Sequence, residues 1–143
     1  MFAWVIAGSL VVGAPALKDG RKSVEPPAGE WLEVDSTNVL NDGRDSPREL
    51  RGSRIWQFTA DTRRVALSDG RAPVTQRAAY ADNGGTLEAE FTVFGGQVVK
   101  AIWKVDGNTL TICEGPAGGA RPTDFTAAKG SGRLLFVLNR IRK

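Results

Sequence analysis

Apolar and polar side chains alternate along most of the chain, in short runs separated by turn residues. In the clearest run, Thr86–Val93, the apolar positions are Leu87, Ala89, Phe91 and Val93. A period of two predicts a β-strand with one face turned inward. Similar runs predict further strands at Gly29–Leu40, Arg54–Ala60, Arg64–Ser68, Thr75–Ala81, Val98–Val105, Thr109–Ile112 and Arg133–Arg140.

Turn signals such as Asp69-Gly70, Asn83-Gly84-Gly85 and Gly95-Gly96 separate these strands. No segment predicts a helix longer than one turn. Short strands with regular turn signals favour an antiparallel sheet that removes its edges by closing on itself. The predicted fold is therefore all-β, an eight-stranded antiparallel up-and-down barrel spanning residues 29–143.

The pair Asp106-Gly107 predicts a type I′ hairpin turn, because both central residues of that turn need a positive φ. This turn places Trp103 opposite Leu110. A longer turn changes the partners but keeps the parity, so Trp103, Leu110 and Ile112 point inward in either case. The segment Glu114–Gly132 is rich in Gly and Pro and predicts a long loop.

The inward positions supply candidate ligand-binding residues, and they are mostly large and apolar. They are Trp56, Phe58, Tyr80, Phe91, Trp103, Leu110 and Ile112, accompanied by Val65, Leu67, Leu87 and Phe136. One interpretation is an apolar pocket with the Tyr80 hydroxyl as its polar handle. The other is a barrel whose side chains fill the interior.

The barrel topology places the connections Asn41–Ser53 and Glu114–Gly132 at the same end. Arg121 and Asp124, together with Glu114, are therefore candidate rim residues that could hold a polar ligand. The alternative is a structured loop held by hydrogen bonds of Arg121 or Asp124, with Phe125 against the last strand.

Glu88 and Glu90 form a pair of carboxylates, a combination that can perform acid–base chemistry. Because they alternate with inward apolar residues, we expect them to face solvent. The chain contains no histidine, which removes the usual general base and the commonest zinc ligand. We therefore predict a protein that is not an enzyme and that has no cofactor and no metal site.

The net charge is +3, and Lys and Arg are scattered, so no nucleic-acid partner is expected. Cys113 is the only cysteine, which excludes an intrachain disulfide. Its parity turns it outward from its strand. It is either a reactive thiol or a small packing residue under a loop, and the second interpretation is favoured.

The apolar run Phe2–Val12 is too short to span a bilayer and is followed by Ala14-Pro15-Ala16. This pattern is typical of a secretory signal peptide, although no Lys or Arg precedes the run. We predict a signal peptide at residues 1–16, a polar linker at 17–28, and a secreted, periplasmic or cell-envelope protein with no stable membrane span in the mature chain. The alternative is an additional strand or helix of the domain.

Gly29-Glu30-Trp31 opens the first predicted strand, and Arg140 ends the eighth. In a closed barrel these ends are neighbours, so the Arg140 guanidinium should lie over the Trp31 indole. This arrangement resembles the lipocalin, or calycin, pattern. The segments 105–113, 121–125 and 134–140 resemble more narrowly a lipocalin-like domain family of unknown function that is abundant in planctomycetes. The resemblance covers residues 29–140 and implies a small barrel, often behind a signal peptide. The family has no assigned activity, so the resemblance identifies no catalytic residues in this chain.

Two hypotheses about function follow. The first is an exported lipocalin-like domain that binds a small apolar or amphipathic molecule inside the barrel. The second is a filled barrel that acts as a structural or protein-interaction module at the cell envelope. The corresponding partners are a small hydrophobic molecule or an envelope protein.

Overall fold

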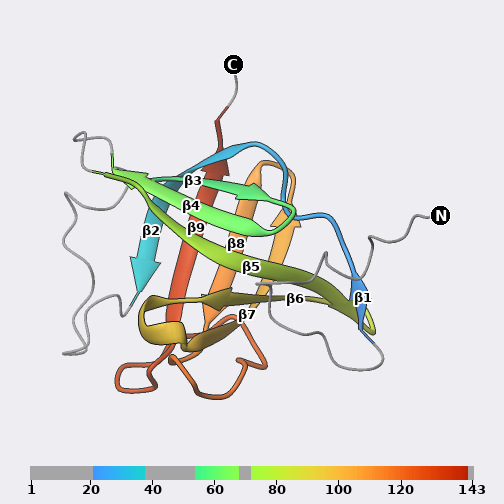
Figure 1. The fold of residues 1–143 in the computed structure, drawn as a ribbon, viewed down its shortest axis with the longest axis vertical. Helices are drawn as coiled ribbons and strands as arrows, with labels where there is room; N and C mark the ends of the chain where they lie inside the picture. Colours follow the sequence, from blue (N-terminus) through green and yellow to red (C-terminus); the bar gives the residue numbers. More distant parts are fainter. Residues whose placement is uncertain (1–20, 38–53, 68–71, 142–143) are drawn as a thin grey trace.

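The computed structural model describes residues 21–37, 54–67 and 72–141. The predicted signal peptide and the predicted loop Asn41–Ser53 lie outside these residues, and the side chain of Leu67 is not described either. The strands are β1 (Lys22–Ser23), β2 (Glu30–Thr37), β3 (Arg54–Thr59), β4 (Thr62–Leu67), β5 (Val74–Asn83), β6 (Thr86–Thr92), β7 (Val98–Asp106), β8 (Thr109–Glu114) and β9 (Leu134–Arg140) (Figure 1). A 3-10 turn, η3 (Phe94–Gly96), separates β6 from β7.

The strands from β2 to β9 form a closed barrel. Each pairs in antiparallel fashion with the next along the chain, β9 pairs back onto β2, and β5 pairs with both β4 and β6. This confirms the predicted all-β fold with an eight-stranded antiparallel barrel. The first barrel strand carries an irregularity between Glu33 and Asp35, where its register against β9 shifts.

The segment 21–28, which lies within the predicted linker, packs on the barrel. Its strand β1 pairs with β5, opposite Ala81 and Asp82. The Val24 amide donates to the Tyr80 carbonyl at 3.2 Å, and the Val24 side chain packs against the core. These residues are therefore part of the folded domain.

Trp31 and Arg140 are directly opposed in the pairing of β2 with β9. The Arg140 guanidinium carbon lies 4.3 Å from the centre of the Trp31 ring, and Trp31 is fully buried. An Arg140 nitrogen also donates to the Ala28 carbonyl at 2.8 Å. The predicted stacking is confirmed, and it ties the end of the last strand to the beginning of the first.

The β7–β8 hairpin differs from the prediction in its turn. Asp106 pairs with Thr109, so Gly107 and Asn108 are the central residues, and Gly107 has a φ of +62°. Trp103 consequently faces Ile112 and not Leu110. The shift is two residues, which preserves the parity, and the inward orientation of these side chains is confirmed.

Candidate functional site

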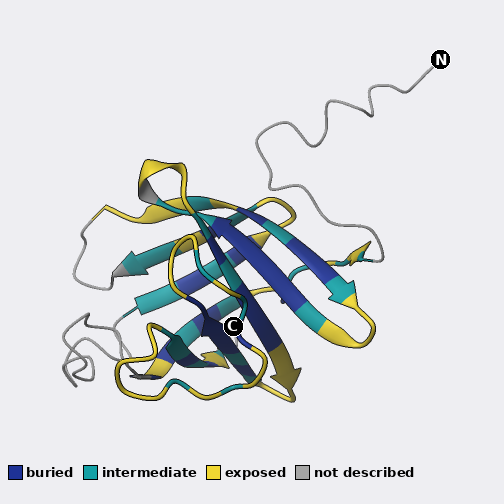
Figure 2. Cartoon of the chain, turned by 90° about the horizontal axis from the view of Figure 1, so that it is seen from below, coloured by how far each residue is buried: buried dark blue, intermediate teal, exposed yellow. Residues whose placement is uncertain are grey.

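The seven candidate ligand contacts, which run from Trp56 to Ile112, are all buried in one core. Figure 2 shows the buried positions along the barrel strands in dark blue. Aromatic rings form a continuous row across this core, with centroid distances of 4.8 Å for Phe136–Trp56, 6.1 Å for Trp56–Phe58, 6.3 Å for Phe58–Tyr80 and 6.3 Å for Tyr80–Phe91. The Tyr80 hydroxyl donates to the Thr62 carbonyl at 2.7 Å. Burial raises the pKa of Tyr80. The expected polar handle therefore already has a partner within the protein.

A buried ion pair joins Arg63 of β4 to Glu114 of β8 inside the barrel. The two residues are only 5% and 4% exposed. The Arg63 guanidinium carbon lies 3.7 Å from the centre of the Phe91 ring and 5.1 Å from that of Trp56. Its Nε also donates to the Gln76 side chain at 2.9 Å. Arg63 thus fills the space between aromatic rings, and Glu114 neutralises its charge.

A second ion pair joins Glu33 of β2 to Arg54 of β3. Glu33 is fully buried, and its carboxylate also accepts a hydrogen bond from the Trp56 indole at 3.0 Å. Burial raises the pKa of Glu33, while the charge of Arg54 opposes that rise. The Arg54 guanidinium carbon lies 5.9 Å from the centre of the Phe136 ring.

Aromatic rings and paired charges therefore occupy the barrel interior. A hollow of about 590 Å³ lined by described residues lies on the outer face of the barrel beside Glu30, Gln57 and Arg64. Sequence patterning missed Glu33, Arg54 and Arg63 as interior residues, and it placed Glu114 in the rim loop, whereas Glu114 ends β8 and points into the barrel. The signal that could have found them is strand parity, because Arg54 shares its face with Trp56 and Arg63 shares its face with Val65.

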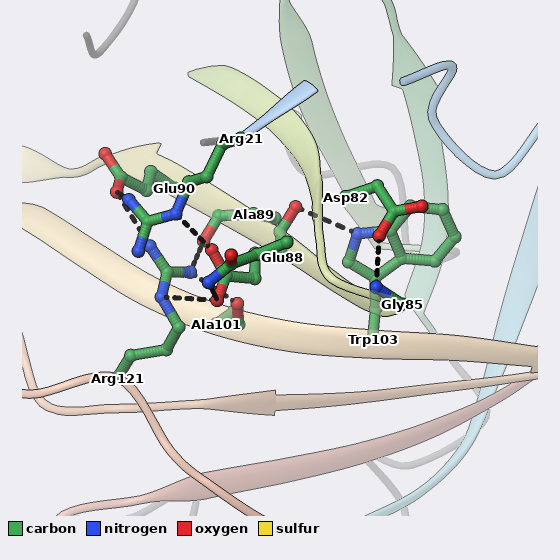
Figure 3. Close-up of polar contacts among 10 residues, drawn as sticks. Arg21, Asp82, Gly85, Glu88, Ala89, Glu90, Ala101, Trp103 and Arg121 are labelled. Carbon is green, nitrogen blue, oxygen red and sulfur yellow. Dashed lines mark hydrogen bonds and ion pairs between the residues drawn. The ribbon is translucent and has the colours of Figure 1, made fainter. Parts of the chain in front are cut away.

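Glu88 and Glu90 point outward from β6 as expected, but the expectation that they face solvent is wrong. They are only 6% and 7% exposed. Arg21 and Arg121 reach these carboxylates from two different segments (Figure 3). Arg21 Nε lies 2.6 Å from Glu88 Oε1, and an Arg121 terminal nitrogen lies 2.7 Å from Glu90 Oε2. The carboxylates thus act as anchors for covering segments, which alternation alone could not reveal.

Arg121 lies on the outer face of β6 and β7. From the sequence it was expected at the mouth of the barrel. One of its terminal nitrogens donates to the carbonyls of Ala89 at 3.0 Å and Ala101 at 2.7 Å. The loop folds back because the amides of Gly115 and Gly118 donate to carbonyls of β7, at 2.8 Å and 2.9 Å. Arg121 therefore fastens the long loop to the outside of β6 and β7.

Asp124 is exposed and accepts hydrogen bonds from Thr126 at 2.6 Å and from Arg133 at 2.8 Å. The hydrogen bond from Thr126, followed by that from Arg133, lowers the pKa of Asp124. The neighbouring Phe125 ring lies 4.5 Å from Lys104 Nζ, which places it over β7. The predicted hydrogen bonds of Arg121 and Asp124 within a structured loop are confirmed, whereas the ring contact of Phe125 is with β7 and not with the last strand as predicted.

Cys113 is fully buried under this loop, and its thiol donates to the Thr126 carbonyl at 3.5 Å. Burial raises the pKa of the thiol to about 11. Two pKa units lower the thiolate fraction by roughly a hundredfold, and the thiolate is the reactive species. We expect Cys113 in the native protein to react with a thiol reagent at pH 8 at least about a hundredfold more slowly than in urea-unfolded protein. Equal rates in the two states would show that the loop does not protect it.

Within residues 21–37, 54–67 and 72–141, no three His, Cys, Asp or Glu side chains group closely enough to hold a metal ion. The same residues include no helix with the length and apolar character needed to cross a membrane.

Polar and charged side chains are thus concentrated in three places: the filled interior, the Arg–Glu cluster on β6, and the hollow on the outer face of β2 to β5. Comparisons of the chain with protein-family models, with curated proteins and with solved structures each found no match.

Proposed function

We propose that this domain is a filled barrel that acts as a protein-interaction module at the cell envelope, through its outer surface and loops. The observation that carries the proposal is the occupied interior. Trp56 contacts Phe58 and Phe136, and Arg63 lies against both Phe91 and Trp56. A carrier of apolar molecules needs a cavity of about 300–1,000 Å³ lined mainly by apolar groups. In this protein two ion pairs and a row of aromatic rings occupy the barrel interior, where such a cavity would lie.

The long loop supports the same proposal. Arg121 fixes it to the barrel wall, and the ion pair of Asp124 with Arg133 joins two positions within the loop. Loops that a rigid scaffold holds in place are common sites of recognition. The envelope location rests on the signal-like sequence of residues 1–16 and on the resemblance to lipocalin-like domains.

The second candidate is the exported lipocalin-like carrier. The observation that favours it is a pair of buried polar atoms without a hydrogen-bond partner, namely the Trp31 indole nitrogen and Arg54 Nε. Buried polar atoms are usually satisfied, so unsatisfied ones point to a missing partner.

Native mass spectrometry on protein isolated from its own envelope fraction separates the two candidates. The interaction module predicts the bare mass of the chain and, under milder conditions, a complex with another protein. A stoichiometric small molecule that is released on denaturation would overturn the proposal and support the carrier. Titration with the apolar fluorophore N-phenyl-1-naphthylamine provides a second readout, because a filled interior predicts no saturable binding.

A further inference from the structure

A row of polar side chains crosses the outer face of β2, β3, β4 and β5. Glu30 is paired with Gln57, Gln57 with Arg64, and Arg64 with Thr75. Neighbouring strands lie about 4.8 Å apart, so the row extends over about 14 Å. It forms one wall of the hollow of about 590 Å³, whose other described walls are Gly29, Phe58, Thr59, Thr62 and Ile141.

The side chains of this row are ordered before any ligand arrives. An Arg64 terminal nitrogen donates to Gln57 Oε1 at 3.0 Å, and Gln57 Nε2 donates to Glu30 Oε2 at 2.8 Å. At the edge of the hollow the hydroxyls of Thr59 and Thr62 lie 2.6 Å apart. Groups that are already held in place lose little conformational entropy on binding, which favours affinity.

The charges of the row limit the class of ligand. One guanidinium and one carboxylate balance each other, whereas a polyanion such as nucleic acid needs an excess of cations. The hollow of about 590 Å³ has room for a ligand larger than a free amino acid. The site therefore suits a longer ligand without net charge.

Hydroxyl groups both donate and accept hydrogen bonds, so a sugar chain can satisfy a carboxylate, an amide and a guanidinium in succession. Ile141 adds apolar surface on which the C–H face of a sugar ring can rest. The volume of the hollow is within the range of small-molecule sites. We propose that this outer hollow binds a neutral oligosaccharide of about two or three rings.

The proposal does not depend on the filled interior, because the site lies on the outside of the barrel. The test is an NMR titration of the full chain with cellotetraose, maltotetraose and chitotetraose in turn. With at least one of them we expect saturable shifts of backbone amides confined to the hollow, at Glu30, Gln57, Thr59, Thr62, Arg64 and Thr75. Arg64→Ala and Gln57→Ala should each weaken that binding at least about tenfold.

Arg133→Ala is the matched control, because it removes a different partly exposed arginine from the long loop, and it should leave binding unchanged. Three results would overturn the proposal: no saturable shift with any of the sugars at roughly 10 mM, shifts centred elsewhere, or undiminished binding by Arg64→Ala. Saturable shifts at Trp56 and Phe91 instead would contradict the filled interior, so the failures of the two proposals can be told apart.

Discussion

Replacing Trp103 by alanine is expected to lower the free energy of unfolding by about 3–5 kcal/mol, the usual cost of truncating a buried aromatic residue. Trp103 is only 7% exposed and lies between its strand partners Leu87 and Ile112. Its indole nitrogen also donates to the Glu88 carbonyl at 3.1 Å. Alanine would leave a cavity and would remove this hydrogen bond. Urea denaturation monitored by circular dichroism measures the effect.

Trp103→Phe is the control, because it keeps most of the ring volume and loses only the indole donor. We expect it to cost roughly 1–2 kcal/mol. A loss below about 1 kcal/mol for Trp103→Ala would mean that this part of the interior is loosely packed. That result would favour a ligand cavity over the filled barrel.

The barrel was predictable because its signals are local. Alternation in Thr86–Val93 and the turn residues around it depend only on neighbouring positions. The closure of β9 onto β2 followed from the chain order together with Trp31 and Arg140, whose stacking the structure confirms. The hairpin turn was misplaced by one residue, because Asp106-Gly107 and Gly107-Asn108 both satisfy the requirement for positive φ.

The polar network was not predictable in the same way, because it depends on contacts between residues far apart in the sequence. Nothing near Glu88 indicates that Arg21 and Arg121 will cover it. The inward position of Arg63 follows from parity, but its partner Glu114 lies four strands away along the chain. Charged side chains are rarely buried, so a charged residue in a barrel strand is normally assigned to the outer face. An inward charged residue such as Arg63 is therefore easily overlooked.

The Arg63–Glu114 pair leads to the second large expected effect. Arg63→Met keeps an unbranched side chain between the Phe91 and Trp56 rings and removes the charge. Because Glu114 is then buried without its counter-ion, we expect a loss of about 3–5 kcal/mol in the free energy of unfolding. Arg133→Met is the matched control: its partner Asp124 is 62% exposed on its side chain, so the loss should be far smaller than that of Arg63→Met.

The double variant Arg63→Met/Glu114→Leu separates the cost of an unpaired charge from the worth of the pair. Replacing a buried ion pair by apolar groups of similar volume is often neutral or stabilising, so the double variant should recover most of the stability lost in Arg63→Met. Equal instability of the single and double variants would contradict this account. It would mean that the hydrogen bonds of Arg63 to Gln76 and its packing on Phe91 stabilise the barrel more than charge pairing does. Recovery would show that the interior tolerates a wholly apolar filling, and that the charges are not required for the barrel to close.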